Sequence, residues 1–272
     1  MEIALKKMRN KINPPEVVKV DSVDYKIEAN IGYGGNADVY KCIDEASGNE
    51  YAIKFQRHVN GNRLNRFKKE IKLNKIIKHD HLIKYIGSGE HERHPFIIME
   101  LAQQNLTEKF RNQESFTKEE YFAQFRGLSK ALACLHEKAI HRDIKPDNIL
   151  ISNGRWLLSD YGLCKFDSDT AQDSITKDGE KVGPAFWMSP EANNRNCGIN
   201  DDISKSSDVF QLASIFWLIV NRMHPTGVLR KADWTGPEKL FEPIFNALHN
   251  DKTVRPKDGN EFFQQIEQAI IG

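Results

Sequence analysis

A short segment of the sequence places three side chains of complementary chemistry close together. The sequence HRDIKPDN at positions 141–148 carries a carboxylate at Asp143, an ammonium group at Lys145 and an amide at Asn148. Phosphoryl transfer depends on positioning, on charge neutralisation and on a base near the attacking hydroxyl. Asp143 can accept the proton of that hydroxyl, Lys145 can lie against the migrating phosphate, and Asn148 can bind a divalent metal ion. The segment therefore predicts phosphoryl-transfer chemistry.

A glycine-rich turn lies near the start of the chain. The sequence GYGGNA at positions 32–37 joins two segments that alternate as strands do, 25–30 and 37–43. Glycines let backbone amides approach phosphate oxygens without an intervening side chain. The same pattern marks dinucleotide-binding folds, in which a helix follows the loop at once. Here residues 38–42 continue as a strand, which favours a hairpin that covers a nucleotide.

Three further charged residues can act on a nucleotide and its metal ion. Lys54 lies on the next predicted strand, 51–56, and Glu70 lies on a predicted helix at 63–78. Their order along the chain predicts an ion pair that aims the ammonium group at phosphates. Asp160 follows an apolar strand and precedes Tyr161-Gly162, so its carboxylate can bind a metal ion that bridges phosphate oxygens.

The composition sets broad limits on the protein. The chain has 272 residues, of which 39% are hydrophobic and 28% charged, and its formal net charge is +1. This balance predicts a soluble protein with no general attraction to nucleic acid or membranes. The longest apolar run, 212–220, is too short to span a bilayer, and residues 1–11 lack the apolar core of a signal peptide. The four cysteines are scattered, without a CxxC pair, which is typical of a reducing compartment such as the cytoplasm.

The pattern along the chain predicts an α+β fold of two lobes with a cleft between them. Residues 1–24 are expected to form an extension outside the core, interrupted by Pro14-Pro15. A strand-rich lobe is predicted at about 25–101 and a helical lobe at about 102–272. The first lobe has, besides the segments above, apolar runs at 82–86 and 96–101 joined by a polar turn at 91–94. The main helices of the second are expected at 118–135, 208–222, 238–248 and 259–270.

Taken together, these motifs make the chain similar to the eukaryotic-type protein kinases, from about Tyr25 to Ile270. The resemblance implies ATP and Mg²⁺ as cofactors and a protein as substrate. It implies catalytic roles for Asp143, Lys145, Lys54 and Glu70, and metal binding by Asn148 and Asp160. The residues that it implies for ATP binding are Ile31, Gly32, Gly34, Val39, Ala52, Lys54, Met99, Glu100, Ala102 and Leu150.

Three other positions match structural features of the same family. Ser189-Pro190-Glu191 resembles the sequence that closes the activation segment, and Arg255 resembles the buried partner of its glutamate. Asp208 resembles the helix aspartate that anchors the catalytic loop. The resemblance implies structural rather than catalytic roles for these residues.

Some residues depart from the family pattern. Ala37 replaces the third loop glycine and adds only a methyl group. Tyr161 stands where phenylalanine is usual and keeps an aromatic ring in the packing. Asn74 lies one turn past Glu70, where the family usually packs an apolar residue, so it could weaken the active alignment and make regulation by a partner conceivable.

The acceptor residue is indicated by two conflicting signals. Pro184, with Trp187 and Met188, resembles the acceptor loop of tyrosine kinases. Lys145 is the serine/threonine form of the catalytic loop, and it would contact the reacting phosphate directly. We therefore expect a serine/threonine kinase, with dual-specificity or tyrosine preference as the alternative. Autophosphorylation is also expected, and Arg142 could pair with a phosphate on one of the hydroxyls of the segment, Ser168, Thr170, Ser174 or Thr176.

Two other functions compete with this interpretation. A nucleotide-binding pseudokinase scaffold would need a lost charge among the chemical positions, and only Asn74 and Ala37 support it. A small-molecule kinase shares the aspartate and asparagine chemistry but generally lacks the closing Ser-Pro-Glu with its distant arginine. A zinc site in the histidine-containing turns at 79–81 and 91–94 is disfavoured, because no cysteine or acid completes a ligand set. The sequence carries no indication of the oligomeric state.

Overall fold

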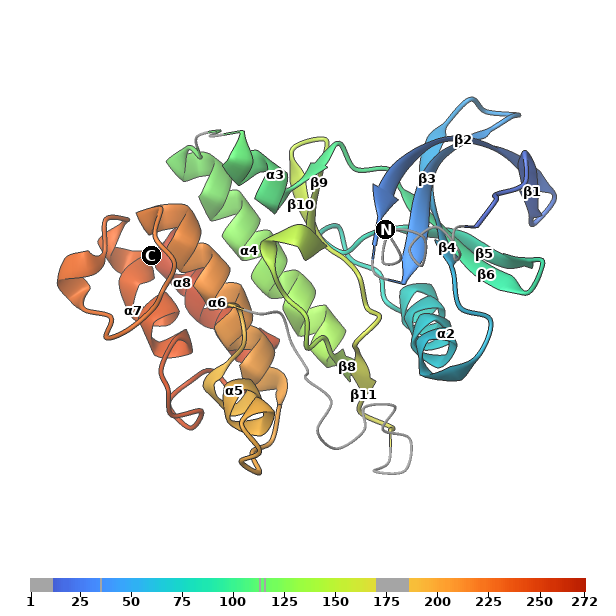
Figure 1. The fold of residues 1–272 in the computed structure, drawn as a ribbon. Coiled ribbons are helices and arrows are strands. Elements are labelled where there is room, and N and C mark those ends of the chain that lie inside the picture. The colour runs from blue at the N-terminus through green and yellow to red at the C-terminus, as the bar shows by residue number, and fades with distance from the viewer. Residues whose placement is uncertain (1–11, 35, 113, 115, 170–185) are drawn as a thin grey trace, which may run out of the picture. The chain divides into compact units, whose positions relative to one another are not determined.

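The computed structural model describes residues 12–34, 36–112, 114, 116–169 and 186–272. The chain forms two compact units, one of Met1–Ile76 with Ile83–Ala102 and the other of Ile77–Leu82 with Gln103–Gly272. The first unit is rich in strands and the second in helices, so the fold is α+β (Figure 1). No helix in the described part of the chain has the length and apolar character needed to cross a bilayer.

The first unit is built on one antiparallel sheet whose strand order is β1-β2-β3-β4-β6-β5. Strand β1 also contacts β5, so the sheet curves around its apolar face (Figure 1). A glycine at position 87 suits this closure, because a Cβ there would lie 2.8 Å from a Val20 methyl group. The strands are β1 (Val17–Val20), β2 (Val23–Tyr33), β3 (Ala37–Asp44), β4 (Glu50–Gln56), β5 (Tyr85–His91) and β6 (His94–Glu100).

The two faces of this sheet carry different side chains. Strand alternation places Ile53 and Phe55 of β4 on the face that holds the buried apolar cluster, and Lys54 on the other. Helix α2 (Gly61–Ile76) contacts β5 and β6. Its buried residues recur at helical spacing and are Phe67, Glu70, Leu73 and Asn74.

The residues before Tyr25 contribute to the core. Strand β1 pairs with β2, and its alternation buries Val18 and Val20 in the apolar cluster, together with Ile12. The expectation that residues 1–24 lie outside the core is therefore wrong for Ile12, Val18 and Val20, while its first part, 1–11, lies outside the described residues. The sequence VVKV is too short for its alternation to stand out, and its burial depends on pairing with β2.

The apolar run at 82–86 is divided between two elements of the structure. Strand β5 begins at Tyr85, and Leu82 instead forms an isolated bridge with Leu158. Leu82 is buried there, within the second unit. One apolar run can thus contribute residues to two different environments, and its periodicity alone does not predict where the strand begins.

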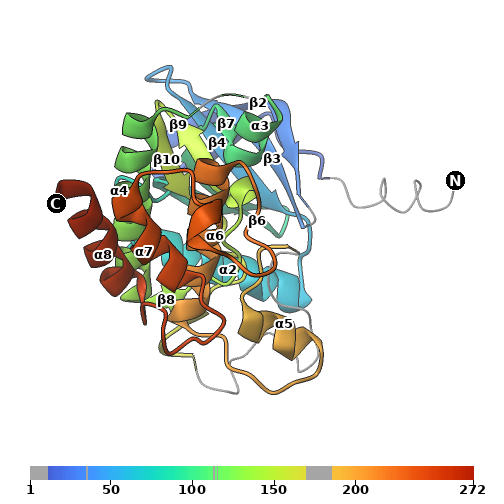
Figure 2. The same cartoon turned by 90° about the vertical axis from the view of Figure 1, so that its left-hand side faces the viewer.

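Helices dominate the second unit (Figures 1 and 2). Helix α6 is buried on nearly all sides, and α4 contacts both α6 and α8. A row of aromatic rings links these helices, since Phe216 stacks on Phe125 at 3.8 Å and on Phe262 at 5.9 Å between centroids. The helices are α3 (Leu106–Arg111), α4 (Lys118–His136), α5 (Pro190–Asn196), α6 (Lys205–Asn221), α7 (Glu238–Ala247) and α8 (Gly259–Ile271).

Short strands hold the loops of the second unit. Strand β8 (Ala139–Ile140) pairs with β11 (Lys165–Phe166), and β9 lies between β10 and β7. The segment 141–148 runs from β8 to β9 and ends in a short 3₁₀ helix. These strands therefore fix both ends of the segment that carries the predicted chemistry. The remaining bounds are β7 (Gln104–Asn105), β9 (Ile149–Ser152) and β10 (Arg155–Leu158).

Candidate active site

An ion pair links β4 to α2 in the first unit. Lys54 Nζ lies 2.7 Å from Glu70 Oε1, and the side chain of Glu70 is 4% exposed. The ring of Phe67 lies 5.8 Å from the same ammonium group. The pair expected from the sequence is therefore present. Because the carboxylate is buried, it can hold the ammonium group in one position.

Asn74 lies one turn along α2 from Glu70 and is also buried. Its Nδ2 donates to the Glu70 carbonyl at 2.9 Å. Among the residues that the structure describes, its Oδ1 has no hydrogen-bond partner. A buried acceptor without a partner costs about 1–3 kcal/mol. The departure noted in the sequence thus places an energetically unfavourable buried acceptor one helical turn from the ion pair.

The predicted nucleotide-binding residues of the first unit share one face of the sheet. Val39 pairs in register with Gly32 on one side and with Lys54 on the other. Ala52, two residues before Lys54 on β4, pairs with Met99 of β6. Paired residues in a sheet point to the same face. These side chains therefore form a continuous surface, opposite the buried apolar cluster.

The remaining residues predicted to bind the nucleotide lie at the ends of strands. Ile31 is 49% exposed on β2, and Glu100 is the last residue of β6. Ala102 follows β6 and is half-buried. Leu150 is half-buried on β9 of the second unit, in register with Leu157.

Two side chains of the loop in the second unit converge on one carboxylate. Lys145 Nζ lies 3.1 Å from Asp143 Oδ2. Asn148 Nδ2 donates to the same oxygen at 2.9 Å and to the Asp143 carbonyl at 2.8 Å. The three residues that the sequence singled out first are therefore in direct contact.

The environment of Asp143 favours the protonated form. Burial raises the pKa of this carboxyl above its usual range, and the charge of nearby Asp160 acts in the same direction. The charge and the hydrogen bond of Lys145, with a smaller effect of the His141 ring, oppose this shift but do not cancel it. A carboxylate with a raised pKa is a better proton acceptor.

Helix α6 supports the backbone of the loop. The buried carboxylate of Asp208 accepts hydrogen bonds from the amide of His141 at 2.6 Å and from the amide of Arg142 at 2.8 Å. Gln211, one turn further, accepts from the amide of Ile144 at 3.0 Å. Arg142 has a φ of 69°, a strained value for a residue other than glycine. Gln211 was not singled out in the sequence, because nothing local connects it with the loop.

Asp160 follows β10 and is exposed, with a φ of 62°. The amide and the hydroxyl of Ser159 both donate to the carbonyl of Asn148, at 2.9 Å each. These bonds bring the chain at Asp160 next to Asn148. Tyr161 is fully buried and donates its hydroxyl to the Leu158 carbonyl at 2.8 Å. The extra oxygen of this tyrosine, compared with phenylalanine, is therefore satisfied.

A buried ion pair joins α5 to the segment before α8. Arg255 donates from Nη2 to Glu191 Oε2 at 2.6 Å and from Nη1 to Oε1 at 3.0 Å. Burial alone would raise the pKa of Glu191, but the hydrogen bonds from Arg255 and Ser207 outweigh it and lower that pKa. The partnership that the sequence implied between Glu191 and Arg255 is thus present.

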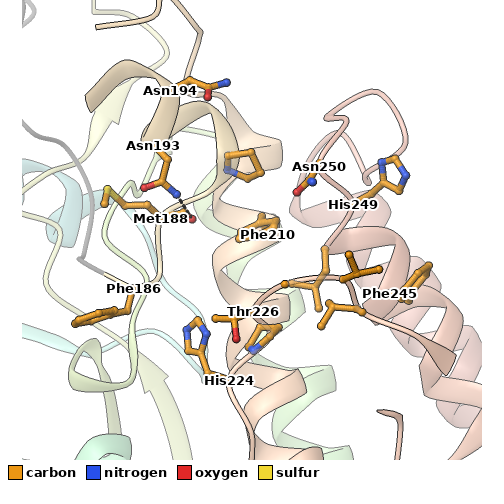
Figure 3. Close-up of a pocket in the computed structure, with 16 residues that line it drawn as sticks. Phe186, Met188, Asn193, Asn194, Phe210, His224, Thr226, Phe245, His249 and Asn250 are labelled. Carbon is orange, nitrogen blue, oxygen red and sulfur yellow. Dashed lines mark hydrogen bonds between the residues drawn. The ribbon is translucent and has the colours of Figure 1, made fainter. Parts of the chain in front are cut away.

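A cavity of about 840 Å³ lies between α5, α6 and α7 (Figure 3). None of the residues that line it is Lys, Arg, Asp or Glu. Phe186 and Val228 line it and are each 86% exposed, and Phe245 comes from α7. Burial lowers the pKa of His224, whose ring lies 4.6 Å from that of Trp187. The cavity therefore holds no carboxylate, ammonium or guanidinium group, and its lining mixes apolar side chains with amide and imidazole groups.

Several candidate residues of the activation segment lie outside the described residues, namely Thr170, Ser174, Thr176 and Pro184. Ser168 is described and exposed. Arg142, the expected partner of a phosphate, donates from Nε to the Leu163 carbonyl at 2.7 Å.

Both a family model and individual related proteins match this sequence. The sequence matches the model of the protein kinase domain over residues 25–270. It is 30% identical over 236 residues to a Bifidobacterium longum protein named "Probable serine/threonine-protein kinase pknA2", covering 84% of this chain and 29% of that protein. It is 32% identical over 185 residues to the serine/threonine-protein kinase PknL of Mycobacterium tuberculosis, covering 66% of this chain and 45% of that protein. The chain thus spans less than half the length of these relatives.

Proposed function

Because this chain belongs to the protein kinase family, we propose that it is an active enzyme that transfers the γ-phosphate of ATP to serine or threonine hydroxyls of proteins. The observation that carries the proposal is the contact of Lys145 and Asn148 with the buried carboxylate of Asp143. A pseudokinase scaffold has no need of this arrangement, and no charged position of the predicted set is replaced.

Asp143 is proposed as the base that accepts the proton of the attacking hydroxyl. Its raised pKa fits this role, because proton transfer is most effective when the pKa of the base lies closer to the working pH. Lys145 contacts Asp143, so a phosphate transferred to a hydroxyl at Asp143 would also lie near its ammonium group. The ammonium group would then offset the negative charge of that phosphate. Asp208 and Gln211 hold the loop and would not touch the substrate.

The donor set at Asn148 and Asp160 fits Mg²⁺. Asn148 uses Nδ2 to bind Asp143, so its Oδ1 is the atom suited to a metal ion, and Asp160 adds a carboxylate. Oxygen ligands of this kind are those that Mg²⁺ prefers. No group of three His, Cys, Asp or Glu in the described residues could hold a metal by itself, so phosphate oxygens and water would complete the site. When bound, the ion would neutralise charge on the phosphates.

In the first unit, Lys54 is proposed to bind phosphate oxygens of ATP, with Glu70 orienting it. The surface formed by Val39, Ala52 and Met99 would pack against the adenine base, since it is apolar and continuous with Lys54. Gly32 and Gly34 would let the turn approach the phosphates. Ile31, Glu100, Ala102 and Leu150 are proposed as further contacts of the nucleotide.

The acceptor is proposed to be serine or threonine. The contact of Lys145 with Asp143 supports this choice, as do relatives named serine/threonine-protein kinases. The resemblance of Pro184, Trp187 and Met188 to tyrosine kinases favours tyrosine or dual specificity, which stays the alternative. The uncharged cavity beside Met188 supports a polypeptide substrate over a small polar one. Autophosphorylation and a cytoplasmic location remain part of the proposal.

Phosphoamino-acid analysis tests the proposed acceptor directly. The protein is incubated with labelled ATP, Mg²⁺ and a generic protein substrate, and the labelled products are hydrolysed to free amino acids. We expect labelled phosphoserine or phosphothreonine. Label only on tyrosine would refute the proposed acceptor, whereas an absence of label would favour the scaffold.

A further inference from the structure

A buried ion pair anchors the end of the glycine-rich turn. The carboxylate of Asp38, at the start of β3, is fully buried. Arg57, which follows β4, donates from Nε to Asp38 Oδ1 at 3.0 Å, and its Nη2 lies 2.9 Å from the same oxygen. A buried carboxylate without a partner is strongly unfavourable. Arg57 supplies the opposite charge for Asp38, and the amide of Ile12 also donates to Asp38 Oδ2, at 3.4 Å.

The same guanidinium also binds the backbone of the turn. Its Nη2 donates to the carbonyl of Gly34 at 2.6 Å and to the carbonyl of Ala37 at 3.1 Å. The amide of Arg57 donates to the carbonyl of Asn36 at 3.0 Å. One residue therefore contacts the backbone at positions 34, 36 and 37. Only arginine offers enough donors in a fixed plane to bind a carboxylate and two carbonyls together.

The ion pair lies on the opposite face of the sheet from the proposed nucleotide surface. Asp38 pairs in register with Phe55, which belongs to the buried apolar cluster, whereas Val39 pairs with Lys54. Because successive side chains of a strand point to opposite faces, Asp38 points away from the face that carries Lys54. Any effect of the ion pair on a nucleotide must therefore pass through the backbone of the turn.

We propose that Asp38 and Arg57 are positioning residues, which hold the glycine-rich turn in the conformation that binds the phosphates of ATP. This inference rests on the proposed function. Glycines make the turn flexible, and ordering it on binding would reduce the affinity for ATP. The two carbonyl contacts order the turn beforehand, together with the hydrogen bond from the Gly34 amide to the Ala37 carbonyl at 3.0 Å.

The variant that separates positioning from stability is Arg57→Lys. Lysine keeps the charge that Asp38 needs, but it lacks the planar fork that reaches the two carbonyls. We expect the melting temperature to change little, while the KM for ATP and the Kd of ATP rise by roughly fivefold to tenfold, as the loss of about one ordinary hydrogen bond would give. At saturating ATP, kcat should stay within about twofold, since the groups that touch the reacting atoms are intact.

Lys19→Ala provides the matched control. It breaks an exposed ion pair with Asp24 in the same sheet, where the Lys19 and Asp24 side chains are 66% and 48% exposed, and it should leave ATP binding unchanged. Hydrogen exchange without nucleotide gives a second readout. In Arg57→Lys the amides of residues 33, 34, 36 and 37 should exchange faster, and those of β6 should not.

The outcomes are distinct. Weaker ATP binding in Arg57→Lys, with an unchanged melting temperature and faster exchange in the turn, supports the inference. Equal affinity of the wild-type protein and Arg57→Lys for ATP overturns it and leaves the proposed function standing. If the wild-type protein does not bind ATP, as measured by titration calorimetry with Mg²⁺, the proposed function and this inference are both overturned.

Discussion

Asn148 donates its side-chain amide to the carboxylate of Asp143 at 2.9 Å, across one short loop of the second unit. This bond joins the proposed metal ligand to the proposed base. It also fixes which atom of Asn148 remains for a metal ion. The effects of substitutions at these two residues should therefore not add up independently when both are changed.

The protonation of Asp143 should make the free energy of unfolding depend on pH. Burial raises the pKa of this carboxyl in the folded state, so the folded protein holds the proton more tightly than the unfolded chain. This group therefore favours folding at low pH and disfavours it once the pH rises through the raised pKa. We expect Asp143→Asn to be at least as stable as the wild-type protein at pH 7.

The measurement for this prediction is thermal unfolding of both proteins at several pH values. The advantage of Asp143→Asn should shrink as the pH falls through the raised pKa of Asp143 toward the ordinary pKa of aspartate, about 4, and should not change further below it. A variant that is less stable at pH 7 and recovers at low pH would contradict the direction assigned to the pKa of Asp143.

Replacing Asn74 by leucine should stabilise the protein. Within the described part of the chain, the buried Oδ1 of Asn74 has no hydrogen-bond partner, and leucine is apolar and similar in size. We expect the free energy of unfolding to rise by about 1 kcal/mol. Urea unfolding measures this change. Asn74→Asp is the matched control and should destabilise, because it would bury a charge beside Glu70.

The ion pair of Glu191 and Arg255 should contribute strongly to the stability of the second unit. Arg255→Met would leave a buried carboxylate unpaired, so we expect a loss of about 3–5 kcal/mol in the free energy of unfolding. Lys252→Met breaks an exposed pair with Asp201 and should cost at most about 1 kcal/mol. Similar losses in the two variants, measured by urea unfolding, would contradict this account.

The pH dependence of this pair has the opposite sign to that of Asp143. The pKa of Glu191 is lowered in the folded state, so its contribution to stability is fully present above the ordinary pKa of glutamate, about 4.3. That contribution is lost as the pH falls through the lowered pKa. The difference between the wild-type protein and Arg255→Met should therefore decrease in acid.

A change in the cavity beside α7 should alter the KM for a protein substrate and not the KM for ATP. Val228 lines this uncharged cavity and is exposed, so Val228→Asp places a charge there without disturbing the core. We expect the KM for a protein substrate to rise roughly tenfold, about 1.4 kcal/mol, with an unchanged KM for ATP. Steady-state kinetics measure both constants. Ile271→Asp, at an exposed position outside the cavity, is the control, and an equal effect from it would refute the proposed docking role.

The sequence grouped three polar residues of the candidate site in one segment, and the structure shows them in contact. Asp143, Lys145 and Asn148 lie within one loop, so their contacts follow from spacing alone. The helices α4, α6, α7 and α8 were predicted to within a few residues, because each is long and periodic.

Features that depend on distant residues were not predicted. Gln211 reaches Ile144 across 67 positions, and no local pattern marks it. The contact joins Asp38, at the start of β3, to Arg57, just after β4, and each residue alone resembles an ordinary surface charge. The burial of Val18 was missed for a related reason, since it depends on the pairing of β1 with β2.

The most direct test of the central claim is transfer of label from γ-labelled ATP to protein, compared between Asp143→Asn and Asp147→Asn. Asp147 is an exposed carboxylate of the same loop, so its variant controls for charge and for folding. The account predicts that Asp143→Asn lowers kcat by at least about a hundredfold, with little change in ATP binding, and that Asp147→Asn stays near the wild-type rate. Equal rates of transfer by the wild-type protein and Asp143→Asn would contradict it.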